Sequence, residues 1–198
     1  MVSRSRISPI RMQSGAWRSA FLRAVCSDCV SRPTSRWLID RNGTAQLPIV
    51  IRSKTGERAH FPRPDANQNL ADISSRYLVF RDLEFSGGSA GLRFLGGASF
   101  ITIEGCNLHE TEDVAIRAND TGGSYEGFRI LRNEVHHTQN GTAEGMYLGC
   151  HPGNCSFFNG LIEGNWVHHI NAPNVTQGDG IEIKDNSYGN VVRDNVIH

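Results

Sequence analysis

Apolar and polar residues alternate in short runs through the second half of the chain, and one seven-residue phrase repeats there. It has an apolar residue, two mostly polar or small residues, Asn or a substitute, any residue, an apolar residue and His. Copies span residues 103–109, 130–136, 162–168 and 192–198, and a degenerate copy spans 80–86. The Asn-equivalent positions are 23, 27, 32 and 30 residues apart. Self-similarity at this period predicts a solenoid of stacked coils.

Within each phrase, the spacing of apolar residues predicts a strand with one buried face. Apolar residues lie three and five positions before the Asn, which is the period of two of a strand. We expect the bend that follows to fall at the Asn, because Asn tolerates left-handed backbone angles. Stacked one per coil, Asn133, Asn165 and Asn195 are predicted to form a hydrogen-bonded ladder, with Cys106 and Leu83 in the same column.

A second strand follows each bend, in residues 91–94, 114–117, 145–148 and 180–183. No stretch after Gly43 has the apolar spacing of an amphipathic helix, so no helices are expected to cover a sheet. Parallel strands need both faces protected. The chain is therefore expected to wind around its own core.

The repeated phrase, and residues 180–198 in particular, resemble right-handed parallel β-helix repeat proteins of the pectate-lyase-like superfamily. The likeness covers about residues 43–198. It implies an all-β fold, a right-handed parallel β-helix of about five coils. The superfamily holds lyases, hydrolases, epimerases, phage tail proteins and adhesins, so the resemblance leaves the chemistry open.

Residues 1–42 differ from the rest and are expected to be a basic leader, disordered or loosely helical, or a mis-assigned start. Residues 1–41 hold eight Arg and two Asp of the twenty basic and twenty acidic residues, so the remainder has a net charge of −6. An acidic body argues against a nucleic-acid partner, which would need a basic stripe. No apolar run reaches eighteen residues, which argues against a membrane span.

The cysteines suggest an oxidising compartment. Cys26 and Cys29 have the spacing of half a zinc site, without a second half. Cys150 and Cys155 bound a short loop, where we expect a disulfide rather than two free thiols. An extracellular or cell-envelope location follows, although no signal peptide is recognisable. No capping coil with a polar outer face follows the last repeat at His198, so the chain is expected to be a fragment of a longer solenoid.

Two columns of outward side chains offer metal ligands. The first holds the imidazoles of His109, His136, His168 and His198, with His137 and His169 beside two of them. These could bind a metal or an anionic sugar, or fill a solvated turn. The second holds the carboxylates of Glu112, Glu144 and Asp179. Calcium, a hard cation with oxygen ligands, is the cofactor they could hold, or they could be exposed turn acids.

The outward face of the second strand is the predicted saccharide groove. One expected line consists of Arg93, Ala115, Tyr147 and Glu182, and the next of Arg117, Gly149 and Lys184. Tyr147 could stack on a sugar ring, with Arg93 beside it. Arg117 and Lys184 could neutralise a uronate carboxylate, and either could take the proton α to it. Glu182 and Asp179 could instead form a hydrolase pair.

Enzymes of the superfamily share only fragments of their motifs with this chain. Gly178-Asp179-Gly180 and Glu182-Ile183-Lys184 are parts of the pectin hydrolase set. Alginate and chondroitin lyases have Lys followed by Ser before an Asn-bearing strand, where this chain has Asn186-Ser187 and Lys184 two residues earlier. We therefore expect a secreted protein that binds or processes an acidic polysaccharide, as a lyase rather than a hydrolase if it is an enzyme. The alternative is a non-catalytic surface or adhesion solenoid.

Overall fold

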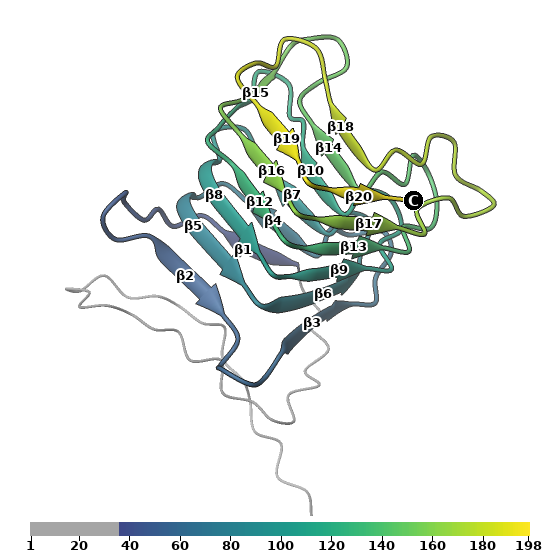
Figure 1. Ribbon diagram of the computed structural model, residues 1–198, viewed down its shortest axis with the longest axis horizontal. Helices are drawn as coiled ribbons and strands as arrows, with labels where there is room; N and C mark the ends of the chain where they lie inside the picture. The colour runs from purple at the N-terminus through teal and green to yellow at the C-terminus, as the bar shows by residue number, and fades with distance from the viewer. Residues whose placement is uncertain (1–35) are drawn as a thin grey trace, which may run out of the picture.

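The computed structural model describes residues 36–198, which contain strands and turns and no α-helix. Three six-stranded parallel sheets run the length of the molecule (Figure 1). Within the described part of the chain, no helix is long and apolar enough to cross a membrane. The predicted all-β parallel β-helix is confirmed.

The strands of each sheet follow one another at every coil. Sheet A contains β1 (Trp37–Ile39), β4 (Ala71–Ile73), β7 (Leu92–Phe94), β10 (Ile116–Ala118), β14 (Met146–Leu148) and β18 (Ile181–Ile183). Sheet B contains β2 (Ile49–Arg52), β5 (Arg76–Arg81), β8 (Ser99–Glu104), β12 (Arg129–Leu131), β16 (Leu161–Glu163) and β19 (Val191–Arg193). Sheet C contains β3 (Ala59–Arg63), β6 (Leu83–Gly87), β9 (Asn107–His109), β13 (Glu134–His136), β17 (Trp166–His168) and β20 (Val196–Ile197). A two-stranded sheet pairs β11 (Ser124–Glu126) with β15 (Ser156–Phe158).

Each coil passes through sheet B, bends into sheet C and then crosses to sheet A. In Figure 1, β3, β6, β9, β13, β17 and β20 lie in one stack, and sheet B meets them at an angle. Sheets B and C each hold one strand more than the five repeats indicated, and sheet A holds two more than the four expected second strands, because the first turn lacks the Asn-bearing phrase. This first turn also includes β1, so the solenoid begins inside the segment expected to be leader. Residues 1–35, with Cys26 and Cys29, lie outside the described residues.

The core fills the space between the three sheets. Inward residues of sheet B stack in register, from Phe80 through Ile103 and Ile130 to Ile162, and each is fully buried. Their outward neighbours remain partly exposed, as the period of two requires. Burial of these apolar columns against the coil above and below is the main source of stability of the coil.

The sharp bend between sheets B and C falls one residue earlier than expected. The left-handed residues are Asp82 (φ 56°), Gly105 (φ 62°), Arg132 (φ 52°), Gly164 (φ 67°) and Asp194 (φ 58°). The asparagines that follow three of them have ordinary backbone angles. The Asn is therefore needed for its amide rather than for its backbone freedom.

The asparagine amides form a continuous ladder inside this bend. The Nδ2 of Asn133 donates to Oδ1 of Asn165 at 2.9 Å and to the carbonyl of Ile103 at 2.9 Å. The Nδ2 of Asn165 donates likewise to Oδ1 of Asn195 at 2.8 Å and to the carbonyl of Ile130 at 2.9 Å. Each Oδ1 also accepts the backbone NH of the preceding coil, and Cys106 N donates to Asn133 in this way.

Candidate functional site

The outer face of sheet A carries one column of charged and aromatic side chains. Asp72, Arg93, Arg117, Tyr147 and Glu182 are paired in register on five consecutive strands. Neighbouring strands lie about 4.8 Å apart, so these side chains occupy adjacent positions along the column. The column therefore presents two cations, a phenol and two carboxylates along one line.

This register corrects the alignment expected for β10. Arg117, rather than Ala115, pairs with Arg93 and Tyr147. Ala115 is fully buried instead, at the level of Gly91 and Gly145, where backbones approach closely. A Cβ added at Gly91 would lie 2.5 Å from the carbonyl oxygen of Ala115. Matching Ala115 to the small residue before each strand would have given the right register, because only a small side chain fits there.

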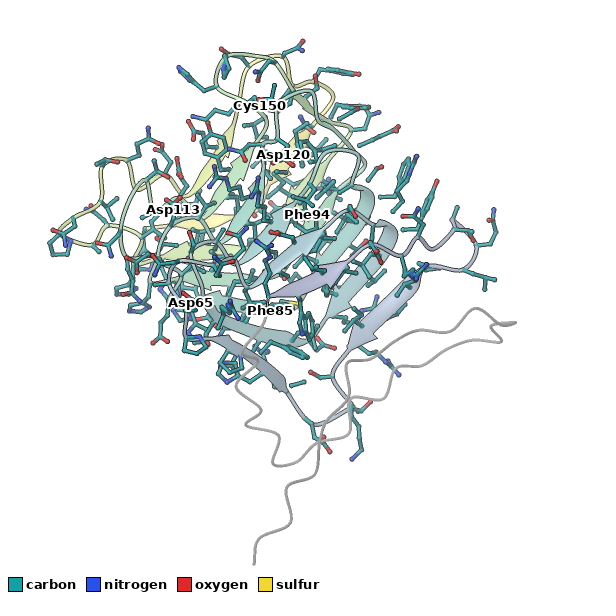
Figure 2. All side chains as sticks on the ribbon, turned by 180° about the vertical axis from the view of Figure 1, so that it is seen from behind. Asp65, Phe85, Phe94, Asp113, Asp120 and Cys150 are labelled. Carbon is teal, nitrogen blue, oxygen red and sulfur yellow. A yellow bond between two sulfur atoms is a disulfide. The ribbon has the colours of Figure 1, made fainter. Side chains whose placement is uncertain are left out.

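Arg93 and Arg117 are both held by polar side chains that the sequence did not indicate as their partners. The guanidinium of Arg93 donates to Oδ1 of Asp120 at 2.8 Å. Arg117 donates from Nε to Oδ1 of Asn119 at 2.8 Å, and its Nη1 lies 3.7 Å from Oδ2 of Asp113. Figure 2 labels Asp113 and Asp120, which come from the two ends of β10. These partners lie in turns without a repeat, so no pattern in the sequence could pair them with the arginines.

Lys184 reaches this column from the turn after β18. Its Nζ lies 4.5 Å from the centre of the Tyr147 ring and makes a close ion pair with Oε1 of Glu182. Burial lowers the pKa of Lys184, but the hydrogen bond with Glu182 and nearby negative charge outweigh it, so the pKa is raised. Lys184 lies level with Gly149, where a Cβ would lie 3.2 Å from the Cβ of Lys184. Gly149, with φ +94°, thus leaves room for the lysine.

Three carboxylates gather beside Lys184. Oxygen atoms of Glu144, Asp179 and Glu182 lie within 4.8 Å of one another. Glu144 is fully buried, and burial raises the pKa of its carboxyl group. Its Oε1 and the Oε2 of Glu182 are buried without a hydrogen-bond partner. Buried carboxylate oxygens are normally paired with a cation, a hydrogen-bond donor or water.

Glu112 does not belong to this carboxylate group, contrary to expectation. Its Oε1 accepts a hydrogen bond from Nδ2 of Asn140 at 2.5 Å, and its backbone NH donates to Gly88. Val114 occupies the level of Glu144 and Asp179, because Ala115 is level with Gly145. The third carboxylate of the group is that of Glu182 instead.

The loop that follows β14 is closed by a disulfide between Cys150 and Cys155, whose Cα atoms are 5.2 Å apart. Figure 2 shows Cys150 on a loop beyond the end of sheet A. The loop begins next to Gly149, so it borders the position of Lys184. Cys106, by contrast, is buried as a free thiol, and burial raises its pKa to about 11.

The histidine column lies on another face of the solenoid. His109, His136 and His168 are paired in register on the outside of sheet C, and their rings stack with centroids 5.0 Å and 4.9 Å apart. Burial and the neighbouring imidazoles lower the pKa of His136 from 6.5 to about 4. The structure thus separates this column from the arginine and lysine residues of sheet A.

No family model matches the sequence, and no curated protein matches it. The structure is similar to the crystal structure of an alginate lyase from Paenibacillus sp. strain FPU-7, with a TM-score of 0.65 and 20% sequence identity. The match covers 82% of this chain and 55% of the alginate lyase chain, so this chain spans little more than half the length of that protein. At this identity the likeness establishes the fold: the chain has the parallel β-helix architecture of that polysaccharide lyase structure.

Proposed function

We propose that the chain is a polysaccharide lyase that acts on an acidic, uronate-containing polysaccharide on the outer face of sheet A. The observation that carries the proposal is the convergence of Lys184, Tyr147 and Arg117. Lys184 lies over the Tyr147 ring, and Arg117 is the neighbour of Tyr147 in the same column. β-Elimination needs a base, a proton donor and a cation for the uronate carboxylate, and these three side chains supply them.

Each residue has a separate task in the reaction. Arg117, with Arg93 one strand further along, binds and neutralises the carboxylate, which makes the α proton more acidic. Lys184 takes that proton, a carbon–carbon double bond forms, and the glycosidic bond to the leaving oxygen breaks. Tyr147 donates a proton to that oxygen and packs against the sugar ring. Glu182 holds Lys184 in place through their ion pair.

The raised pKa of Lys184 has a consequence for the pH dependence. Lysine acts as a base only when it is neutral, and the ion pair with Glu182, which raises the pKa of Lys184, further favours the protonated form. Lyase activity should therefore rise with pH into the alkaline range. A substrate that disrupts the Glu182 pair would lower the pKa of Lys184 and so activate the base.

Calcium fits the carboxylate group beside the proposed base. Glu144, Asp179 and Glu182 offer oxygen ligands within 4.8 Å of one another, and two of these residues have orphaned oxygens. A bound calcium ion would supply positive charge that stabilises the substrate carboxylate. Glu112 takes no part, because its side chain binds Asn140.

Two alternatives are less well supported. In a hydrolase, Glu182 and Asp179 would act as acid and base, but Glu182 is ion-paired with Lys184. In a non-catalytic adhesin, the outward columns would satisfy one another, as the asparagines do. The orphaned oxygens of Glu144 and Glu182 argue against this second alternative.

The test is absorbance near the ultraviolet band of unsaturated uronates, with alginate, pectate and chondroitin as substrates and calcium present. We expect one substrate to give a signal, and Lys184→Met and Tyr147→Phe each to lower kcat by about 10²–10⁴-fold. Lys54→Met is the matched control. Lys54 is exposed, pairs with Glu57 and is far in sequence from Tyr147 and Lys184. Release of reducing ends without absorbance would favour the hydrolase, and neither signal would favour the adhesin.

We also propose that the protein acts outside the cytoplasm. The disulfide between Cys150 and Cys155 persists in oxidising compartments. The proposed uronate-containing polysaccharide would also be encountered outside the cytoplasm. Fractionation of the native host, followed by thiol labelling under non-reducing conditions, should find the protein outside the cytoplasm with both cysteines protected.

A further inference from the structure

The outer face of sheet C carries a second cluster of possible ligands, separate from the site on sheet A. His60 lies on β3, Glu84 on β6 and His109 on β9, so each comes from a different coil. These strands are neighbours in the sheet, in the order β9, β6, β3. The stacking of three coils in sheet C therefore brings two imidazoles and one carboxylate together.

The three side chains point their ligand atoms at a common position. Nε2 of His109 lies 3.2 Å from Oε1 of Glu84, and Nε2 of His60 lies 3.7 Å from the same oxygen. All three ligand atoms are within 4.8 Å of one another. Ligands of one tetrahedral zinc ion at 2.0–2.2 Å are about 3.3 Å apart, so small side-chain movements would complete the geometry.

The surroundings of the cluster favour metal binding. Nδ1 of His109, the nitrogen turned away from Glu84, lies 3.6 Å from Oε2 of Glu110, so a small movement of this exposed carboxylate would give the hydrogen bond of a carboxylate–histidine–metal arrangement. Oγ of Ser86 lies 2.7 Å from Nε2 of His60. Asn107, in register with Glu84 on the next strand, has a buried Oδ1 without a hydrogen-bond partner. A carboxylate, a hydroxyl and an unpaired carbonyl oxygen thus surround the ligand atoms.

The cluster is also accessible from solvent. His60 and Ser86 border an open hollow of about 540 Å3, together with Glu110 and Glu112. A hydrated ion could therefore reach the imidazoles without opening the coil. Two carboxylates against the one guanidinium of Arg63 leave the lining of the hollow negatively charged, which would attract a cation.

We propose that His60, Glu84 and His109 bind a divalent transition metal ion, of the class of zinc. Two imidazoles and one carboxylate select such an ion over calcium or magnesium, which prefer oxygen ligands. The fourth position is left to Ser86 or to water. Because the ligands come from three consecutive coils, the ion fastens the first coils of the solenoid to one another. The site is independent of the proposed lyase chemistry on sheet A.

The test measures zinc binding to the whole chain by calorimetry, and cobalt binding by visible absorption, at pH 7.5. We expect one tight equivalent that a large excess of calcium does not displace. His60→Gln and Glu84→Gln should each weaken it by at least about 10–100-fold, the cost of losing a residue that only orients a metal ligand, while circular dichroism stays unchanged. Zinc should raise the unfolding temperature of the wild type more than that of these variants.

A matched control addresses the other histidines. Nδ1 of His136 and Nδ1 of His137 are 2.6 Å apart, and those of His168 and His169 are also 2.6 Å apart, so these pairs are competing sites within residues 36–198. The double variant His137→Gln, His169→Gln should keep the tight equivalent. Loss of binding in this control with retention in His60→Gln would overturn the assignment. Absence of any tight zinc equivalent in the wild type would also overturn it.

Discussion

The asparagine ladder and the carboxylate group of sheet A are both stacks of polar side chains on the same solenoid, but only the ladder is complete. Asn165 is almost fully buried, and its amide gives and receives hydrogen bonds along the stack. Glu144 is fully buried too, yet its Oε1 has no partner. An amide carries both donor and acceptor, so identical neighbours satisfy one another, whereas carboxylates only accept and repel.

This difference separates structural stacks from functional ones. In a column whose side chains form hydrogen bonds with one another, a substitution should lower the free energy of unfolding. In a column that holds only acceptors, a substitution should weaken the binding of a cation or substrate. Three experiments test the distinction, beginning with the largest expected effect.

Asn165→Ala should lower the free energy of unfolding by about 2–4 kcal/mol, because it leaves donors and acceptors of two coils buried and unpaired. Urea unfolding followed by circular dichroism measures the change. Asn154→Ala is the control, since the Asn154 amide is at the surface and makes one contact of 3.4 Å. Equal losses in the two variants would mean that the ladder has no special role.

Glu144→Gln should have the opposite effect and raise the free energy of unfolding by about 1 kcal/mol without calcium, because a neutral amide replaces a buried charge. The raised pKa of Glu144 means that the folded state holds its proton more tightly than the unfolded state. That stabilisation is present at low pH and is lost as the pH rises through the folded pKa. The variant should lose this pH dependence and any stabilisation by calcium. A destabilised variant that still responds to calcium would contradict the comparison.

The histidine column should give the smallest effect, with the reverse pH dependence. The pKa of His136 is lowered from 6.5 to about 4, so the unfolded state binds the proton first as the pH falls. Stability should therefore decrease between pH 6.5 and pH 4. In His136→Gln, the unfolding temperature should fall by a few degrees less between pH 6.5 and pH 4 than in the wild type, as scanning calorimetry can measure. An unchanged slope would show that other groups control acid unfolding.

The candidate site was predictable only in part. Lys184, Tyr147 and Glu182 lie on the face where their place in the repeat put them. Arg117 was expected on the neighbouring line, because Ala115 was taken for an outward residue when it is buried. Glu112 was expected in one column with Glu144 and Asp179, yet Val114 occupies that level of the coil. Both errors are a shift of two residues in the turn before β10, where Arg117 and Val114 take the places expected for Ala115 and Glu112. The turns differ in length from coil to coil, so the repeat alone does not fix the size of this shift.

The sequence by itself determined the coil, its parallel strands and the asparagine column, because this information is local and is repeated at every turn. Only the tertiary structure decided which side chains meet across coils. The orphaned oxygens of Glu144 and Glu182, and the meeting of His60 with Glu84 and His109, depend on register between segments more than twenty residues apart. The steps between repeats vary from 23 to 32 residues, so the loops set that register, and the loops follow no pattern.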